Sequence, residues 1–360
     1  MSEALSQPAG DIAEDKAPGQ TETSGQVSDR VPRVSIGLPV YNGENFLEQA
    51  LDSLLAQTFG DFELIISDNG STDRTQQICR NYAARDNRIR YFRNETNRGA
   101  SWNFNNVFSL ARGEYFKWAA HDDVCAPEFL EVCVSVLDRE PEVVLCYGWT
   151  QMVDLEGREL ENMYPTPKIS NMDSSRPYQR FHGAIFPDHW CFEVFGLIRR
   201  AVLRQTALIA NYAGSDRVLL ADLTLQGRFH EVPARLFFNR NHPSRSIQKH
   251  SVYTVAVWYD PKTKIRVTFP YWRYLWEYGR AVAHSELDGQ ERVRCYAQLF
   301  LWMGQYAKQL AADFRRAGMT LLLVISPKTG ELISRVVHEG PHVLFGPRNR
   351  VQGEKSKRKA

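Results

Sequence analysis

Short apolar runs and amphipathic stretches alternate along the first part of the chain. The apolar runs predict strands at 33–38, 62–67, 89–93, 114–118 and 143–147. Between the first two, apolar residues recur at the spacing of one helix face, at Leu47, Ala50, Leu51, Leu54 and Leu55. This alternation is typical of βαβ units. It predicts an α/β fold with a mainly parallel sheet and helices on both faces.

The later part of the chain follows a less regular pattern, in which helical spacing returns at 214–228, 271–285 and 291–317. We therefore expect five parts. Residues 1–31 are rich in small and polar side chains and should be disordered. Residues 32–150 and 151–250 should form two halves of the α/β domain, followed by a helical C-terminal region at 251–345 and a basic, flexible tail at 346–360.

Composition excludes several classes of protein. The 360 residues are 43% hydrophobic, enough for a substantial core, and a net charge of +2 gives no reason to expect nucleic acid as the partner. The longest apolar run, 319–325, is far shorter than the ~20 residues of a membrane-spanning helix, and no secretory signal pattern is found. The six scattered cysteines lack metal-site spacing, so we expect reduced core thiols in a cytoplasmic protein.

Polar clusters follow three of the predicted strands. They are Tyr41-Asn42-Gly43-Glu44, Asp68-Asn69-Gly70-Ser71 and His121-Asp122-Asp123. One such cluster would be an ordinary turn. In parallel sheets ligands bind beyond the carboxyl ends of the strands, so three clusters at the same rim predict a binding site.

The adjacent aspartates Asp122 and Asp123 repel each other and gain nothing from packing at a strand end. A divalent cation would remove that repulsion. Mg²⁺ or Mn²⁺ is the expected guest, because both prefer oxygen ligands and keep positions for water and substrate phosphates. Such a site suits a nucleotide diphosphate, whose departure the cation would stabilise. The alternative is that Asp122 caps the helix that begins near Pro127 while Asp123 is solvated.

Several motifs, in order and spacing, resemble the family 2 glycosyltransferases. They are VSIGLPVYNGE at 34–44, SLLAQT at 53–58, SDNGSTD at 67–73, NRG at 97–99, and GEY at 113–115 followed by HDD at 121–123. The resemblance covers residues 33 to about 245. It implies the GT-A fold, a nucleotide-sugar donor and, for most members, transfer with inversion.

The resemblance also implies donor-binding residues. Those in the nucleotide pocket would be Pro39, Tyr41 and Glu44, with Asp68 on the base and Asn97, Arg98 and Asp122 near the ribose or phosphates. Asp122 and Asp123 take the place of the family's DXD motif as metal ligands, although Ala120 and His121 depart from a strict Asp-x-Asp. His242 lies where relatives place a basic residue or a metal-ligating histidine, and it is a third candidate ligand.

The segment 214–220 resembles the one that carries the family's catalytic base, which points to Asp216. Inverting transfer needs one carboxylate to take the proton of the acceptor hydroxyl, opposite the leaving group. As an alternative, Asp216 is simply the N-cap of the helix that follows. His189 and Trp190 are candidates for the acceptor wall, although aromatic residues at this density also suit a core.

Together these features predict an enzyme that moves a sugar from a nucleotide-diphosphate donor to a saccharide or lipid-linked acceptor, in bacterial cell-surface polysaccharide or glycolipid synthesis. Two other classes use a similar sheet. A sugar-phosphate nucleotidyltransferase usually has a glycine-rich loop with Arg and Lys after the first strand, which 39–43 does not offer. A non-catalytic nucleotide-sugar-binding module would keep Asp68 and could lose Asp216.

The predicted C-terminal helices are rich in Trp, Tyr and Arg. Trp272, Tyr274, Trp276 and Tyr278 alternate with charged residues. They suit packing on the catalytic domain, which we expect, or a membrane interface as the alternative. The basic tail would add weak attraction to anionic lipid, so we expect a cytoplasmic protein with peripheral association at the inner face of the membrane.

Overall fold

The computed structural model describes residues 21–23, 30–161, 171–186, 190–242 and 269–325, with side chains to residue 318. The predicted basic tail at 346–360 lies outside these ranges, as do parts of the other predicted segments. Within the described residues, strands and helices alternate from residue 34 to residue 118, after which a second short strand precedes the next helix. The alternating part of the sequence pattern is therefore confirmed.

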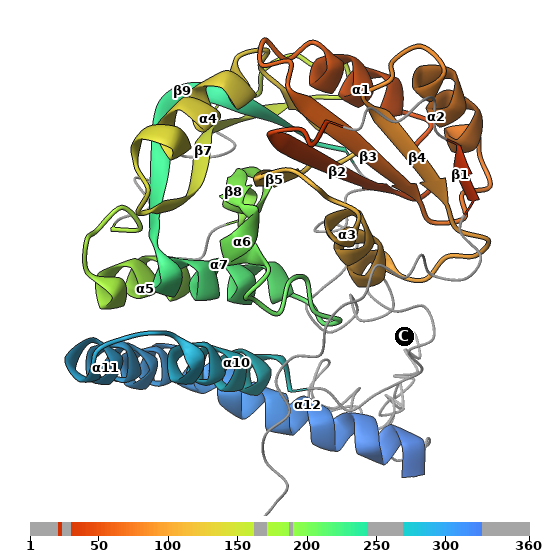
Figure 1. Ribbon diagram of the computed structural model, residues 1–360. Helices are drawn as coiled ribbons and strands as arrows, with labels where there is room; N and C mark the ends of the chain where they lie inside the picture. The colour runs from red at the N-terminus through yellow and green to blue at the C-terminus, as the bar shows by residue number, and fades with distance from the viewer. Residues whose placement is uncertain (1–20, 24–29, 162–170, 187–189, 243–268, 326–360) are drawn as a thin grey trace, which may run out of the picture.

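The strands that the structure describes form one nine-stranded sheet. Their bounds are β1 Thr21–Thr23, β2 Val34–Val40, β3 Phe62–Asp68, β4 Ile89–Arg93, β5 Tyr115–Trp118, β6 Val124–Cys125, β7 Val143–Val153, β8 Leu197–Arg199 and β9 Arg228–Arg240. The order across the sheet is β1-β4-β3-β2-β5-β8-β7-β9-β6. The sheet curves strongly at its β7–β9 side (Figure 1).

Parallel pairing dominates the first half of the sheet. Strands β4, β3, β2 and β5 are parallel neighbours, as βαβ connections require. The second half is mixed, because β8 is antiparallel to both β5 and β7 while β7 and β9 are parallel. The parallel half places the carboxyl ends of β2, β3 and β5 at one rim.

Helices cover both faces of the sheet (Figure 1). One face carries α1 Leu47–Leu55, α2 Thr75–Ala83 and α4 Phe129–Arg139, and the other carries α3 Ala100–Ser109, α5 Pro177–Ile185 and α7 Ser215–Gln226. The short 3₁₀ helix η1 Phe192–Phe195 and helix α6 Arg200–Leu203 flank β8. Helices on both faces agree with the predicted fold class.

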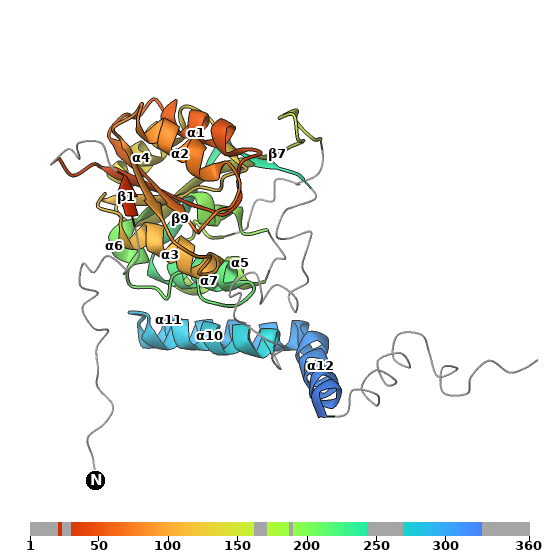
Figure 2. The same ribbon diagram turned by 90° about the vertical axis from the view of Figure 1, so that its right-hand side faces the viewer.

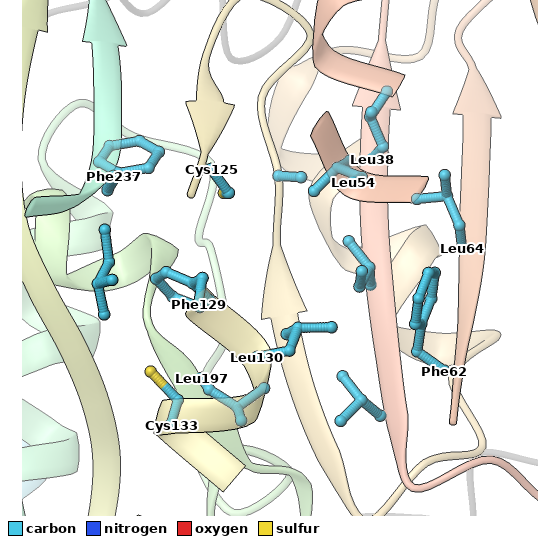
Figure 3. Close-up of a cluster of buried hydrophobic side chains, with 14 of the residues drawn as sticks. Leu38, Leu54, Phe62, Leu64, Cys125, Phe129, Leu130, Cys133, Leu197 and Phe237 are labelled. Atoms are coloured by element: carbon cyan, nitrogen blue, oxygen red, sulfur yellow. The ribbon is translucent and has the colours of Figure 1, made fainter. Parts of the chain in front are cut away.

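Each face of the sheet has its own hydrophobic core. In the first, leucines of α1 lie over β2 and β3, and α4 packs on β7, β8 and β9. Figure 3 shows Leu54 beside Leu38 and Leu64, and Phe129 on the side of Phe237 and Cys133. In the second, α3, α5 and α7 pack against the opposite face. Burial of these side chains removes apolar surface from water, at roughly 25 cal/mol per Å². The loops at the rim are therefore attached to a well-packed sheet.

The C-terminal region is helical, as predicted, but its described part, 269–325, contains three helices rather than two. They are α10 Pro270–His284, α11 Gly289–Gln305 and α12 Ala307–Ile325. The predicted continuous helix at 291–317 is interrupted at Tyr306, whose φ of −100° and ψ of 19° leave the helical region. Gly304, two residues earlier, has the lowest helix propensity except for proline. Helices α10 and α11 form a layer beneath α5 and α7 (Figure 2).

Two further expectations concern the N-terminal segment and the cysteines. Residues 1–31 were expected to be disordered, but Thr21–Thr23 forms β1, antiparallel to β4. The edge of a sheet carries unpaired N–H and C=O groups, which an extended threonine-rich segment can satisfy. All six cysteines are buried, as expected, and none is paired in a disulfide. Among the described residues, no helix is both long and apolar enough to cross a membrane.

Candidate active site

The three polar clusters lie together at the rim of the sheet. Strand β2 stands between β3 and β5, with Val40 paired to Asp68 and Gly37 paired to Trp118. The residues that follow these strands therefore leave the sheet side by side. The predicted grouping of the clusters at one rim is confirmed.

Hydrogen bonds join the loop after β2 to the turn after β3. The backbone N–H of Asn42 donates to Ser71 Oγ over 2.9 Å, and Asn42 Oδ1 accepts from the N–H of Thr72 over 2.9 Å. The N–H of Gly43 donates to Thr75 Oγ1 over 2.9 Å. Asn42 has a φ of 52°, a left-handed conformation that asparagine tolerates better than most residues. The two loops thus form one preorganised wall.

Residues expected in the nucleotide pocket differ in their exposure. Pro39 is buried, while Tyr41 is 44% exposed at the rim. Glu44 accepts hydrogen bonds from the backbone N–H and the Nε of Arg74, over 3.1 and 3.2 Å. Of these three side chains, only the Tyr41 ring presents a large open surface to a ligand.

Asp68 is fully buried beneath the turn. Its Oδ1 accepts the N–H of Ser71 over 2.8 Å, and its Oδ2 accepts the hydroxyl of Tyr91 over 2.9 Å and lies 3.4 Å from Arg93 Nε. Burial and the Asp68 charge raise the pKa of Tyr91, which keeps that hydroxyl protonated as a donor. In this arrangement Asp68 orients the turn, and its carboxylate is already hydrogen-bonded on both oxygens.

Asn69 connects the turn to the predicted phosphate-side residues. Its Nδ2 donates to Asn97 Oδ1 over 2.9 Å, and its Oδ1 accepts the backbone N–H of Arg98 over 3.0 Å. Arg98 is exposed, and its guanidinium lies 3.9 Å from the centroid of the Trp102 ring. The sequence placed Asn69 in a strand-end cluster without a role of its own, and the structure shows that this buried residue holds Asn97 and Arg98.

Asp122 faces His242 across the rim. His242 Nε2 lies 2.9 Å from Asp122 Oδ2, and both side chains are largely shielded, with 8% and 19% exposed. His121 Nδ1 is 4.0 Å from the other carboxylate oxygen. Burial works to raise the pKa of Asp122, but the hydrogen bond from His242 and the two histidines together hold it below its ordinary value. Asp122 is therefore kept ionised.

Asp123 contacts the end of strand β9. Its Oδ1 accepts the Nδ2–H of Asn239 over 2.9 Å and the backbone N–H of Arg240 over 3.0 Å. Strand β6, which begins one residue later, is antiparallel to β9. Asp123 thus anchors its loop to the end of β9, two residues before His242.

Arg240 is buried, at 2% exposed, and holds the same loop in place. It donates to the carbonyl oxygens of Asp122, Asp154 and Leu155 and to Gln49 Oε1, over 2.6 to 3.2 Å. Its guanidinium also lies 4.8 Å from the Phe46 ring. A buried arginine with this many acceptors locks the position of Asp122. The sequence did not single it out, because arginine is rarely buried.

Asp216 lies in the first turn of α7. The N-cap residue of that helix is Gly214, with a φ of 77°, so the alternative in which Asp216 is the N-cap is wrong. Asp216 Oδ1 accepts the N–H of Arg217 over 2.9 Å. Its carboxylate also interacts favourably with the positive end of the helix dipole.

Helix α3 holds the segment that leads into α7. Ser101 Oγ and Asn105 Nδ2 both donate to the carbonyl of Ile209, over 2.6 and 3.0 Å, and the N–H of Ile209 donates back to Asn105. The first turn of α3 follows Arg98 directly. One helix therefore supports both the phosphate-side residues and the approach to Asp216.

Of the two acceptor candidates, His189 lies outside the described residues. Trp190 is 39% exposed, and its ring packs edge-on to Phe192 with centroids 5.7 Å apart. Trp190 thus has one face anchored by the domain and another open to solvent.

The Asp122–His242 pair fits a divalent cation as two ligands. One carboxylate and one imidazole nitrogen, already within hydrogen-bond distance and mostly shielded from bulk water, are suitable donors for Mg²⁺ or Mn²⁺. Among the described residues, no group of three or more acidic, histidine or cysteine side chains is placed to enclose a metal. A cation at this site would accordingly take its remaining ligands from water and substrate.

Residues 35–205 match the family model for glycosyl transferase family 2. An uncharacterized glycosyltransferase of Rickettsia felis is 33% identical over 159 residues, covering 43% of this chain and 25% of that protein. Another, of Rickettsia typhi, is 35% identical over 140 residues, or 39% of this chain and 43% of that protein. Chondroitin synthase of Escherichia coli is 33% identical over 141 residues, 39% of this chain and 20% of the synthase. The chain spans less than half the length of each of these relatives.

Solved structures show the same fold. S. aureus TarS 1-349, crystallised in complex with UDP-GlcNAc, superposes with a TM-score of 0.57 at 15% identity, covering 80% of this chain and 81% of that one. Its complex with UDP gives a TM-score of 0.53 at 17% identity, covering 74% and 70%. The sheet, its two helical faces and its polar rim are those of a GT-A fold. Over residues 35–205, this chain is similar to the glycosyltransferases of family 2.

Proposed function

We propose that this protein is an inverting glycosyltransferase that moves a sugar from a nucleotide-diphosphate donor to an acceptor hydroxyl. The observation that carries the proposal is the Asp122–His242 pair, held at the carboxyl-end rim of a family 2 domain. A carboxylate kept ionised beside an imidazole is a site for a divalent cation, and a cation at this rim suits a diphosphate.

Named relatives support the class of donor and the setting. TarS was crystallised with UDP and with UDP-GlcNAc, and chondroitin synthase of E. coli is a named relative of the catalytic segment. We therefore place the reaction in bacterial cell-surface polysaccharide or glycolipid synthesis, with a nucleotide-diphosphate sugar as donor and a saccharide or lipid-linked acceptor.

Asp122 and His242 would hold Mg²⁺ or Mn²⁺, and Asp123 and Arg240 would keep the loop of Asp122 in place. A cation held there would supply positive charge to neutralise the diphosphate of the departing nucleotide. Arg98, exposed and supported by Asn69 and Trp102, would add positive charge on the same side. The open ring of Tyr41 would stack against the nucleotide, and Asp68 would set the turn beneath it.

Asp216 would act as the general base. Inverting displacement needs one carboxylate, without metal duty, to accept the proton of the acceptor hydroxyl as the new glycosidic bond forms. Asp216 is not the N-cap residue of α7, and α3 links its approach segment to the donor side of the rim. Trp190, with its exposed face, is the acceptor-side residue of this scheme.

A thermal-shift screen tests the proposal. The full chain is melted with nucleoside diphosphates and nucleotide sugars, each with and without Mn²⁺. A ligand that binds only the folded protein raises its melting temperature. At a ligand concentration of one hundred times Kd, the free energy of unfolding rises by about 2.7 kcal/mol. We expect stabilisation by one class of nucleotide sugar, larger with Mn²⁺. No shift with any nucleotide, in either condition, would contradict the donor assignment.

A further inference from the structure

The outer surface of the C-terminal helices is unusually apolar. The described residues include eleven large hydrophobic side chains that are exposed, and seven of them lie on α10, α11 and α12. These seven are Trp272, Trp276, Val293, Tyr296, Phe300, Leu301 and Phe314. Phe300 and Trp276 are the most open, at 78% and 70%. We call the six on α10 and α11 the outer face.

The outer face follows helical periodicity. On α10, Trp272 and Trp276 are one turn apart, on the side opposite Tyr274 and Tyr278. On α11, Val293 and Phe300 are two turns apart, opposite the buried residues Cys295, Leu299 and Trp302. Both helices are thus apolar on two sides. A helix that is apolar on two sides is expected to be covered on both of those sides.

The inner side is already covered by the catalytic domain. Tyr274 donates to the carbonyl of Ala213 over 2.8 Å, directly ahead of the helix that carries Asp216. His182 of α5 lies 2.8 Å from Gln298 of α11, and Tyr278 packs edge-on to Phe181. The expected packing on the domain is therefore confirmed. Figure 2 shows α5 and α7 on one side of the layer of α10 and α11, and helical periodicity places the outer face away from that side.

The exposed charged residues on the described parts of α10, α11 and α12 are basic. Helices α10, α11 and the described part of α12 contain three carboxylates, Glu277, Glu291 and Asp313, and all three are buried. Arg273, Arg280, Lys308, Arg315 and Arg316 are exposed on the same helices. The exposed acids nearby, Glu286 and Asp288, lie in the loop between α10 and α11. The helices thus present aromatic residues within a basic surround.

We propose that the outer face docks on an anionic lipid surface. Tryptophan and tyrosine prefer the boundary between headgroups and acyl chains, and basic residues are attracted to anionic headgroups. A second copy of the chain is a poorer occupant. A symmetric interface would bring the two basic surrounds together, and like charges repel. Docked in this way, the layer of α10 and α11 lies between the lipid and the catalytic domain.

Vesicle co-sedimentation of the full chain tests this proposal without any sugar transfer, so its outcome is independent of the proposed activity. We expect binding to vesicles of phosphatidylglycerol and phosphatidylcholine in equal parts, little binding to phosphatidylcholine alone, and weaker binding in added salt. Trp276→Ser with Phe300→Ser should weaken binding by more than about ten-fold, because two anchoring rings are lost. Leu155→Ser, which removes an exposed apolar side chain elsewhere, should leave it unchanged.

The same proteins distinguish docking on lipid from unfolding of the variant and from self-association. Both substituted rings are exposed, so the double variant should keep the wild-type melting temperature; Phe300→Ser alone serves if it does not. Equal binding by wild type and variant would overturn the proposal, as would failure of the wild type to bind anionic vesicles. A wild type that sediments as a dimer in solution, with a monomeric variant, would assign the outer face to a second copy instead.

Discussion

His242 Nε2 lies 2.9 Å from Asp122 Oδ2, although 120 residues separate them along the chain. The contact exists because β6 and β9 are antiparallel neighbours, so the loop before β6 meets the residues after β9. The contact between Asp122 and His242 therefore depends on the pairing of these two strands. The candidate metal site is thus a product of the mixed half of the sheet, while the nucleotide wall belongs to the parallel half.

Asp123→Ala should act on stability rather than directly on a ligand. The change leaves the Nδ2–H of Asn239 and the backbone N–H of Arg240 without their carboxylate acceptor in a buried position. An unsatisfied buried donor costs about 1–3 kcal/mol. We expect a lower free energy of unfolding, measured by urea denaturation.

The matched comparison is Asp122→Asn, which keeps a polar group of the same size and disturbs no anchor to β9. We expect its free energy of unfolding to stay within about 1 kcal/mol of the wild type. If Asp123→Ala unfolds like the wild type while Asp122→Asn is strongly destabilised, the two roles are exchanged.

Asp216→Asn should lower the transfer rate by about 10²- to 10⁴-fold, because the amide cannot accept the acceptor's proton. Donor affinity, which rests on the opposite rim loops, should change little. The loss of a carboxylate in the first helical turn costs about 0.3–1 kcal/mol of stability. Donor-sugar consumption and melting temperature measured on one purified variant report both quantities.

Asp222→Asn is the control on the same helix. Burial raises the pKa of Asp222, so ionising it opposes folding and its contribution to stability falls as pH rises through that pKa. The amide should therefore leave the protein as stable or more stable at neutral pH, with turnover within a few-fold of the wild type. Near-normal turnover by Asp216→Asn would remove Asp216 from the mechanism.

Glu63 makes stability depend on acid pH. Burial works to raise its pKa, but hydrogen bonds from Ser35, the N–H of Arg112 and Arg90 outweigh it and hold the pKa below its ordinary value. A depressed pKa gives stability that is present above the unfolded value of about 4.3 and lost as pH falls through the folded value. Glu63→Gln should lose about 2 kcal/mol at pH 7.

The cost of Glu63→Gln should shrink below about pH 4, where the wild-type carboxylate is protonated too. Urea denaturation at both pH values measures the difference. Glu114→Gln, at an exposed carboxylate paired with Arg33, should change stability by less than about 1 kcal/mol at either pH. An equal loss for Glu63→Gln at both pH values would show that its charge is irrelevant.

Hydrophobic periodicity was sufficient for most of the parallel half of the fold. The predicted strand at 89–93 coincides with β4, and that at 62–67 falls one residue short of β3. Strands β6 and β8 were missed because two or three residues carry no detectable period. Strand β9 was missed because Pro233 and the register shifts against β7 break its alternation.

For the site, the sequence indicated the loops but not the contacts within them. Strand-end clusters identify a rim in any parallel sheet, so Tyr41, Asp68 and Asp122 could be proposed without coordinates. That Asp68 is enclosed by Tyr91 and Arg93, or that Asp123 turns toward β9, depends on residues far away in the chain. Such pairings come from tertiary packing and leave no periodic signal.

Calorimetry of nucleotide-sugar binding, with and without Mn²⁺, tests the central claim most directly. The nucleotide sugar is the one selected by thermal shift, and the proteins are the wild type, Asp122→Asn and, as a control, Asp173→Asn, whose carboxylate is exposed. We expect Mn²⁺ to lower the Kd of the nucleotide sugar by at least about ten-fold, both for the wild type and for Asp173→Asn. A change of that size corresponds to a modest coupling free energy between the cation and the nucleotide sugar. In Asp122→Asn this gain should disappear. An undiminished effect of Mn²⁺ in Asp122→Asn would contradict the account.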